Sequence, residues 1–303
     1  MRKIIDIHMH LGDIFHENKN ITFKTGIKKG GFFDPFTAVE ESGYTKYLIA
    51  EEQEEQNKVI DAGQFRVWQG TLENTLADME ATGVVKAVAL PCLPNTTFEE
   101  YLAASLLDDR IIPFTGADLT LSIPEMEKKL EKDIARGAKG LKLHPIIQNV
   151  SLEDDRMAAA TELFGKKGLP VNIHVGIGSY YRPDSPWAKV TNPLFGDPKY
   201  LYAFAKRFPN YTLIAAHSCW IAEDLAKNTA GCDKVYVDTS FCPAHLVQKG
   251  VEVLGADKVM YGTDYPFSSM ECCARIIEDA FPDDAEMREK IFYKNAARIL
   301  GLE

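Results

Sequence analysis

The chain has 303 residues, of which 46% are hydrophobic and 26% are charged, so it is long enough for one large domain or two small ones. Its formal net charge of −10 argues against non-specific binding of nucleic acid, because neutralising phosphates requires a basic surface. No apolar run approaches the roughly 20 residues that cross a bilayer, and no signal peptide is evident. We therefore expect a cytoplasmic protein that binds neither membranes nor nucleic acid.

The first predicted element is an apolar strand over Lys3–His8, which leads into His8-Met9-His10. Residues two apart on a strand point to the same face, so the imidazoles of His8 and His10 should project together from its end. Two convergent imidazoles are half of a divalent-metal site. Packing in the core is the alternative for either histidine taken singly.

A long segment separates this strand from the next one. The interval from Leu11 to Val84 is much longer than a strand-to-helix connection needs, and a predicted helix near Thr71–Thr82 occupies only its end. We therefore predict an insertion at about residues 12–68 of a single domain that spans residues 1–303. Because the insertion follows the first strand, it should cover the catalytic mouth as a lid. A role in dimerisation is the alternative.

Seven further strands alternate with helical segments, several of which end at a glycine such as Gly83 or Gly255. The strands are short and almost continuously apolar, as strands buried on both faces should be. This pattern predicts an α/β fold, a (β/α)8 TIM barrel, with a doubly wound sheet as the alternative. Ligands bind at the C-terminal ends of the strands in either fold. The seven strands are Val85–Leu90, Ile111–Ala117, Gly140–His144, Val171–His174, Thr212–His217, Lys234–Asp238 and Lys258–Thr263.

Histidines gather at the C-terminal ends of these strands. Five of the seven histidines close a predicted strand or lie just beyond one, and such a set is hard to obtain by chance. Imidazole and carboxylate ligands suit zinc, manganese or iron, and a catalytic metal takes about three of them, lowering the pKa of its water towards ~7. These candidates are His8, His10, His144, His174 and His217, with Asp264 after the last strand.

The motifs at these strand ends resemble those of the amidohydrolase superfamily, in particular its "amidohydrolase 2" branch of TIM-barrel metal-dependent hydrolases. The resemblance runs from Ile4 to Leu302, and the insertion is its least matched part. Together the motifs are specific for the superfamily and the metal, and poorly specific for the substrate. They are His8-x-His10, Asn172-Ile173-His174-Val175, Ala215-Ala216-His217, Gly262-Thr263-Asp264-Tyr265-Pro266 and the terminal Asn295–Gly301.

The resemblance implies a role for each matched residue. His8, His10 and His174 would ligate one divalent metal ion, for which we expect Zn²⁺, with Mn²⁺ or Fe²⁺ as the other options. Asp264 would ligate this ion or hydrogen-bond its water, and would act as the proton shuttle. His217 would polarise the substrate, hold the leaving group or contact the metal.

Lys142 and His144 alternate with leucines, so they share one face of their strand. Some superfamily members carry on this strand a carboxylated lysine that bridges two metals. Lys142 could be carboxylated in the same way, could bind the substrate as an ammonium group, or could form a buried ion pair. His144 is expected to bind the substrate or to support a ligand. Arg182 and Arg66 could each bind a substrate carboxylate, although a surface position is the alternative for both.

The function predicted from these residues is a metal-dependent hydrolase of a small carboxylic ester, lactone or amide. Metal-activated water would attack the carbonyl, and Asp264 would carry the proton to the leaving group. The main alternative is a non-oxidative decarboxylase or hydratase of an unsaturated or aromatic acid. A metal-dependent nuclease is opposed by the acidic charge, and a non-catalytic barrel by the intact ligand set. We expect a small-molecule substrate, a carboxylic acid derivative, and a homodimer, the commonest oligomer.

Overall fold

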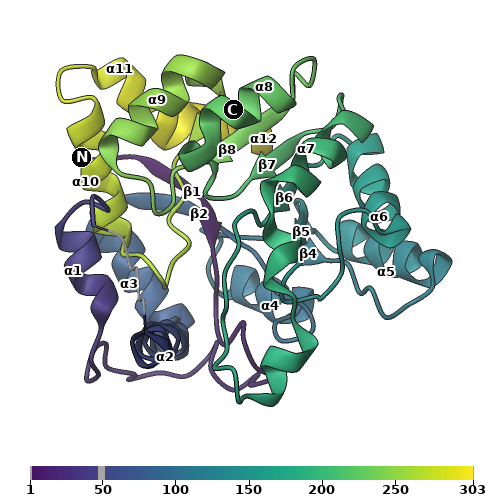
Figure 1. The fold of residues 1–303 in the computed structure, drawn as a ribbon, viewed down its shortest axis with the longest axis horizontal. Helices are drawn as coiled ribbons and strands as arrows, with labels where there is room; N and C mark the ends of the chain where they lie inside the picture. Colours follow the sequence, from purple (N-terminus) through teal and green to yellow (C-terminus); the bar gives the residue numbers. More distant parts are fainter. Residues whose placement is uncertain (1, 47–51, 303) are drawn as a thin grey trace.

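A computed structural model of the chain describes residues 2–46 and 52–302. Parallel strands form the wall of a barrel, and helices surround it (Figure 1). Every predicted strand is present, and the third is divided at Phe114. The strands are β1 (Ile4–Met9), β2 (Val84–Ala89), β3 (Ile111–Pro113), β4 (Thr115–Gly116), β5 (Leu141–Leu143), β6 (Val171–Ile173), β7 (Leu213–Ala215), β8 (Val235–Asp238) and β9 (Val259–Met260).

The helices between the strands begin and end at local sequence signals. Thr97 caps α4 through a reciprocal pair of hydrogen bonds with Glu100, and α3 ends at Gly83 in the left-handed conformation that glycine tolerates. The helices are α1 (Pro35–Glu41), α2 (Gln53–Gln69), α3 (Leu72–Thr82), α4 (Phe98–Leu107), α5 (Ile123–Ala135), α6 (Asp155–Lys166), α7 (Pro198–Arg207), α8 (Ala222–Asn228), α9 (Ala244–Leu254), α10 (Met270–Ala280), α11 (Ala285–Glu289) and α12 (Asn295–Leu300). Within the described ranges, none of them is long and apolar enough to cross a bilayer.

The strands follow one another around the barrel in chain order. One ladder joins β1, β2 and β3, and a second joins β4 through β9. The barrel closes between β1 and the segment after β9: the N–H of Asp264 donates to the carbonyl of His8 (2.8 Å), and that of His10 to the carbonyl of Tyr265 (2.7 Å). This seam fixes Asp264 against the two histidines of the first strand.

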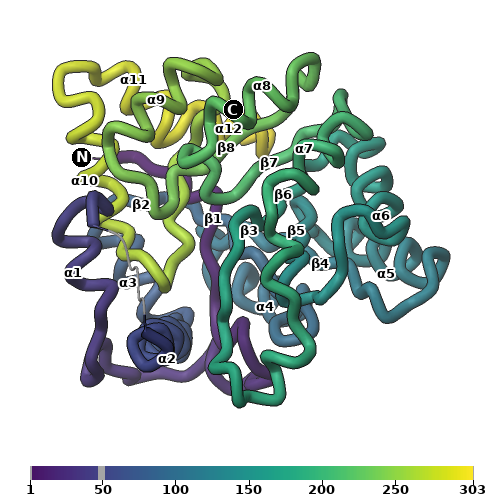
Figure 2. The backbone as a smooth tube through the Cα atoms, in the orientation of Figure 1, coloured from purple at the N-terminus to yellow at the C-terminus, as the bar shows by residue number. Residues whose placement is uncertain are grey.

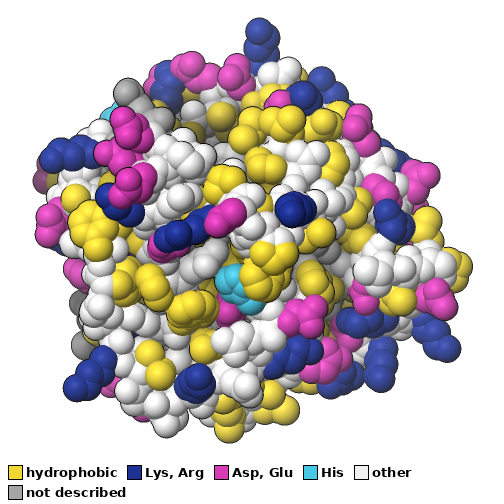
Figure 3. Space-filling model, turned by 60° about the horizontal axis from the view of Figure 1, so that its bottom comes forward, with side chains coloured by type: hydrophobic (Ala, Val, Ile, Leu, Met, Phe, Trp, Pro, Cys, Tyr) yellow, Lys and Arg dark blue, Asp and Glu magenta, His cyan; other side chains and the backbone are white. Residues whose placement is uncertain are grey.

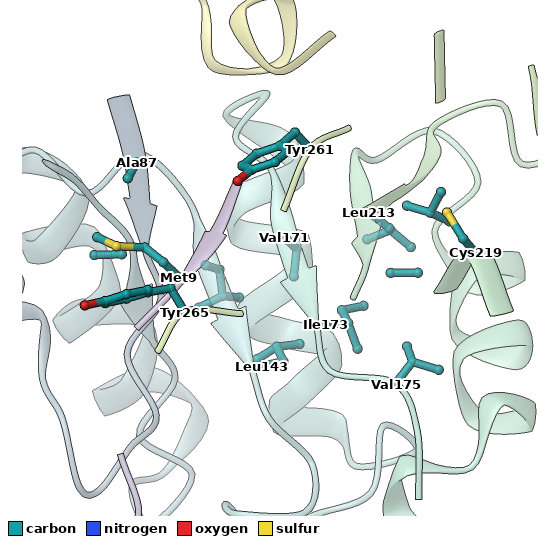
Figure 4. Packing of buried hydrophobic residues seen from close by; sticks show 14 of the residues in the cluster. Met9, Ala87, Leu143, Val171, Ile173, Val175, Leu213, Cys219, Tyr261 and Tyr265 are labelled. Carbon is teal, nitrogen blue, oxygen red and sulfur yellow. The ribbon is translucent and has the colours of Figure 1, made fainter. Parts of the chain in front are cut away.

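Side chains on the outer face of the strands pack under the helices. Leu143, Ile173 and Leu213 belong to this buried cluster (Figure 4). Because side chains alternate along a strand, the neighbouring Lys142 and Asn172 face the barrel interior. They meet there through a hydrogen bond of 2.8 Å from Lys142 Nζ to Asn172 Oδ1. The alternation that builds the core therefore also delivers polar groups to the interior.

The predicted insertion contains α1 and α2, which precede α3. Figure 2 shows the chain leaving the end of β1 and running to the side of the molecule on which α2 lies. On that side, Phe36 of α1 and Val59, Ile60 and Gly63 of α2 line a cavity over the strand ends. The insertion thus contributes walls to the site, while its action as a moving lid stays a prediction.

Candidate metal centre and active site

Four of the predicted site residues converge where β1, β7 and β9 end. His10 Nε2 lies 2.9 Å and His8 Nε2 3.3 Å from the same oxygen of Asp264, Oδ1. His217 Nε2 lies 3.5 Å from the other oxygen, Oδ2. All four side chains are largely removed from solvent. Three imidazoles therefore surround one carboxylate.

Two of these residues have unusual backbone conformations. His217 has a φ of +59° and Asp264 a φ of +56°, in the left-handed region that non-glycine residues rarely adopt. Such a conformation costs roughly 1–3 kcal/mol and persists only where the surrounding structure enforces it, which is most often at functional sites. Here it turns both side chains towards the centre of the barrel mouth.

The hydrogen bonds of His8 and His10 fix which ring nitrogen carries the proton. His10 Nδ1 lies 2.6 Å from the carbonyl oxygen of Leu90, which can only accept, so Nδ1 must donate. His8 Nδ1 lies 2.8 Å from a carboxylate oxygen of Asp238 and donates in the same way. When these rings are neutral, the lone pairs of both Nε2 atoms therefore face Asp264 Oδ1. Burial disfavours the charged rings, but neighbours that include Asp264 outweigh it and raise the pKa of both histidines, so positive charge, from a second proton or from a metal ion, is favoured between these nitrogen atoms and the carboxylate.

The geometry fits a divalent cation at this point. Nitrogen atoms of His8 and His10 and an oxygen of Asp264 lie within 4.8 Å of one another. Asp264 Oδ1 is buried, and the described residues offer it no hydrogen-bond partner. Ligand atoms of His8, His217 and Asp238 form a second group within the same 4.8 Å limit, but both oxygens of Asp238 already accept hydrogen bonds. The first group is therefore the candidate metal centre, and its two imidazoles and one carboxylate suit zinc, manganese or iron.

His174 and His144 lie beside this centre, stacked on each other with ring centroids 4.1 Å apart. His174 Nε2 is 3.1 Å from the carbonyl of Gly176 and 2.9 Å from the hydroxyl of Tyr180. Since the carbonyl only accepts, this Nε2 carries the proton, so His174 would have to bind a cation through Nδ1. His174 belongs to neither group of convergent atoms, so its predicted role as a ligand stays a prediction.

Lys142 is fully buried beside the centre. Its Nζ lies 3.5 Å from His8 Nε2 and donates a hydrogen bond to Asn172. Burial lowers the pKa of this lysine, because a low-polarity environment disfavours the charged form. Among the described residues it has no carboxylate partner within 4.0 Å, so the structure does not favour the ion-pair alternative. An ammonium group for the substrate and a carboxylated lysine both stay open.

The charges at the site follow from burial and from neighbours. Burial alone would raise the pKa of Asp264, but His8, His217 and His10 outweigh it and hold that pKa well below its usual value. Burial lowers the pKa of His217 to about 4, and that of His174 well below its ordinary value. At neutral pH, Asp264 is therefore an anion and the imidazoles of His217 and His174 are neutral.

A cavity of about 380 Å³ opens over the centre. Among the described residues that line this cavity, Asp264 is the only acidic residue, and none is a lysine or an arginine. A histidine side chain is visible near the middle of this face, bordered by hydrophobic side chains (Figure 3). The apolar and aromatic side chains of the wall are Phe15, Phe36, Val59, Ile60, Val175, Ile177, Tyr180, Trp220, Phe241 and Phe267.

The structure places both candidate arginines outside this wall. Arg182 is exposed and is ion-paired with Asp61 of α2. Arg66 is paired with Asp34 and Glu40. Neither guanidinium lines the cavity, so the geometry does not support the predicted substrate-binding role of Arg182. Its pairing instead ties the loop after β6 to α2.

Two residues that the sequence analysis did not select have clear places in the site. Asp238 ends the apolar strand β8 and binds His8, and a lone buried carboxylate at a strand end was the available signal. Tyr180 contacts His174 and stacks on Phe15 with ring centroids 5.4 Å apart. No local pattern distinguishes Tyr180 from its neighbour in the loop.

Comparisons with known proteins agree with this geometry. A family model described as amidohydrolase matches residues 5–302. No curated protein sequence matches the chain. Similar solved structures include an uncharacterised TIM-barrel protein from Bordetella bronchiseptica, at 16% identity over 99% of both chains with a TM-score of 0.68.

Two further structures of this kind are described by an activity. One is a 5-carboxyvanillate decarboxylase from Novosphingobium aromaticivorans with bound manganese, at 16% identity over 99% of this chain and 97% of that chain with a TM-score of 0.62. The other is described as a probable 2-pyrone-4,6-dicarboxylic acid hydrolase from Acinetobacter baumannii, at 12% identity over 99% and 100% with a TM-score of 0.58. At these identities the likeness shows the fold, and the predicted TIM barrel is confirmed.

Proposed function

The chain belongs to the amidohydrolase family, and from this premise we propose that it is a metal-dependent enzyme that removes the carboxyl group of a small aromatic or unsaturated acid without oxidation. His8, His10 and Asp264 would hold one divalent cation, with His174 as a further ligand through Nδ1. When bound, the cation supplies a positive charge that polarises and orients the reacting oxygen atoms of the substrate. Zinc is our expectation, and the manganese in a similar structure makes that ion the second one to test.

The apolar cavity is the observation that carries this proposal. Decarboxylation begins with a carboxylate and releases uncharged CO₂, whereas hydrolysis of an ester, lactone or amide ends with a new carboxylate. An apolar enclosure disfavours a buried charge, so it favours the reaction that removes one. The flat aromatic side chains of the wall also suit a flat, apolar substrate. A decarboxylase of an aromatic acid shares this fold.

Residues at the centre would divide the remaining work. Lys142 does not line the cavity, but its Nζ lies 3.5 Å from His8 Nε2, where an ammonium group would supply positive charge behind the metal centre for the substrate carboxylate. The carbon that loses CO₂ must gain a proton. Asp264 would deliver this proton after taking it from a substrate hydroxyl or a water molecule. His217, neutral and 3.5 Å from Asp264 Oδ2, would orient that carboxyl group.

Hydrolysis, the activity predicted from the sequence, stays the second candidate because of the charge of Asp264. Its pKa lies well below the usual value, so the carboxylate is ready to accept a proton from an attacking water. Decarboxylation needs the same group to be loaded with a proton first.

One experiment separates the two reactions. The purified protein is loaded with Zn²⁺ or Mn²⁺ and incubated with aromatic and unsaturated monocarboxylic acids, lactones and esters in ¹⁸O-labelled water. Release of CO₂ with no ¹⁸O in the organic product supports decarboxylation, whereas incorporation of one ¹⁸O into a new carboxylate supports hydrolysis. Turnover that persists in Asp264→Asn would contradict the role of Asp264 in either reaction.

A further inference from the structure

Asp238 joins two histidines of the site through its two carboxylate oxygens. It is fully buried at the end of β8. Its Oδ2 accepts from His8 Nδ1 at 2.8 Å, and its Oδ1 accepts from the backbone N–H groups of Ser240 (3.1 Å) and His217 (3.2 Å) and from the Ser240 hydroxyl. Burial disfavours its charge, but His8, His217 and Ser240 outweigh this and hold the pKa of Asp238 well below its usual range.

Ser240 extends this network to the ring of His217. Its hydroxyl has one proton, which goes to Asp238 because a carboxylate can only accept. The serine oxygen is also 2.7 Å from His217 Nδ1, so it must accept there and Nδ1 must donate. The lone pair of His217 Nε2 then faces Asp264. The chain of donors from His217 to Ser240 to Asp238 thus has one consistent direction.

We propose that Asp238 is the positioning residue that sets the tautomers of two histidines at once, His8 directly and His217 through Ser240. Each imidazole is thereby held with its proton on Nδ1 and its Nε2 lone pair towards the centre. The network has two arms with different consequences. The hydrogen bond from His8 to Asp238, the His8 arm, governs cation affinity. The hydrogen bonds from His217 through Ser240 to Asp238, the Ser240 arm, govern the reaction. Gly262 allows this arrangement, since a Cβ there would lie 2.7 Å from the Cβ of Asp238.

The other histidines of the site provide internal references. His10 donates from Nδ1 to the carbonyl of Leu90, independently of Asp238. His144 is in the opposite tautomer, because its Nδ1 accepts from the backbone N–H of Ile147 at 3.4 Å. A change that passes through Asp238 should therefore alter His8 and His217 while it leaves His10 and His144 unchanged.

The first test uses the wild-type protein without metal. Long-range ¹⁵N–¹H spectra of the imidazoles, at about pH 9 where ordinary imidazoles are neutral, report which nitrogen is protonated. We expect Nδ1–H at His8, His10 and His217 and Nε2–H at His144. An Nε2–H without an Nδ1–H at His8 or His217 would overturn the proposal, because Asp238 would then not hold the proton on Nδ1. Because this measurement involves neither metal nor substrate, it separates a failure of the tautomer assignment from a failure of the proposed function.

The second test separates the two arms by mutation. An amide at Asp238→Asn cannot accept on both sides, so the tautomer of His8 or of His217 should change. Loss of such a partner behind a ligating histidine typically weakens metal binding by about 10–100-fold. Ser240→Ala should release the tautomer of His217, keep the dissociation constant for Zn²⁺ within about threefold of wild type, and lower kcat while KM changes little.

Matched controls remove a similar group elsewhere. Ser218→Ala removes a buried hydroxyl next to His217 that donates to the carbonyl of Ala216 at 2.9 Å. Asp133→Asn alters a buried carboxylate of α5 that binds Thr115 and Lys129. Zn²⁺ affinity, measured by chelator competition, should be unchanged in both. Equal Zn²⁺ affinity in Asp238→Asn and wild type, with unchanged spectra at His8 and His217, would refute the proposal.

Discussion

Substitution of Gly262 by alanine should damage stability and metal binding together. The new Cβ would lie 2.7 Å from Asp238 Cβ, 3.0 Å from Asp238 Cγ and 3.2 Å from His8 Cβ. Favourable carbon–carbon contacts lie at about 3.5–4.0 Å, so Asp238 and His8 must move. Overpacking of this kind costs about 1–3 kcal/mol, and a cost of 2 kcal/mol changes the unfolding equilibrium by roughly 30-fold.

The same movement should weaken cation binding. His8 contributes a ligand atom and Asp238 orients it, so displacement of the pair should raise the dissociation constant for Zn²⁺ by about 10-fold or more. Urea unfolding without metal measures the stability change, and chelator competition measures Zn²⁺ affinity.

A second alanine substitution separates packing from metal binding. At Gly165 of α6, a Cβ would meet the ring of Tyr211 at 2.3 Å, so Gly165→Ala should also destabilise the protein. That contact does not involve His8, His10, Asp238 or Asp264, so Zn²⁺ affinity of the folded variant should be unchanged. If Gly262→Ala keeps both wild-type stability and wild-type Zn²⁺ affinity, the inferred close packing of Gly262 against Asp238 and His8 is wrong.

Four other outcomes are expected. Asp264→Asn should abolish turnover while much of the metal stays bound, which activity assays and elemental analysis check together; wild-type-like turnover would exclude the proton-shuttle role. In the metal-free protein, the pKa of His217 is lowered from 6.5 to about 4, so the unfolded chain binds the proton first as the pH falls. The stability that this residue contributes is complete above about pH 6.5 and is lost by about 1.4 kcal/mol per pH unit down to about pH 4. In urea unfolding, the free energy of unfolding of His217→Asn should therefore fall less steeply with decreasing pH over this range than that of the wild type. An equal dependence on pH in both proteins would contradict the assignment. Gly63→Leu places a side chain towards Phe267 at the cavity wall, so it should raise KM for the substrate and leave Zn²⁺ affinity unchanged. Steady-state kinetics test this, with the smaller substitution Gly63→Ala for comparison. One metal per chain in elemental analysis is expected if Lys142 is an ammonium group, and two would indicate carboxylation.

The local pattern of the chain accounts for most of the fold. Short apolar runs predicted all eight strands, and glycines such as Gly83 and Gly255 correctly marked helix ends. These signals are readable because strand burial and helix termination depend on a few neighbouring residues. The bounds differ: the third strand is divided at Phe114, and several strands are shorter than predicted, with β9 limited to Val259–Met260.

The sequence alone also determined which side chains stand at the strand ends. Parallel strands of a barrel end at one rim, and the residues at or just after the predicted strand ends include His8, His10, His217 and Asp264. What they contact there was decided only by the tertiary structure. The partner that fixes the tautomer of His8 is Asp238, 230 residues away in the chain, and Arg182 turned out to pair with Asp61 rather than face the cavity. Such contacts depend on which distant segments the closed barrel brings together. A hydrogen bond forms only at defined distances and angles, and sequence spacing does not specify these.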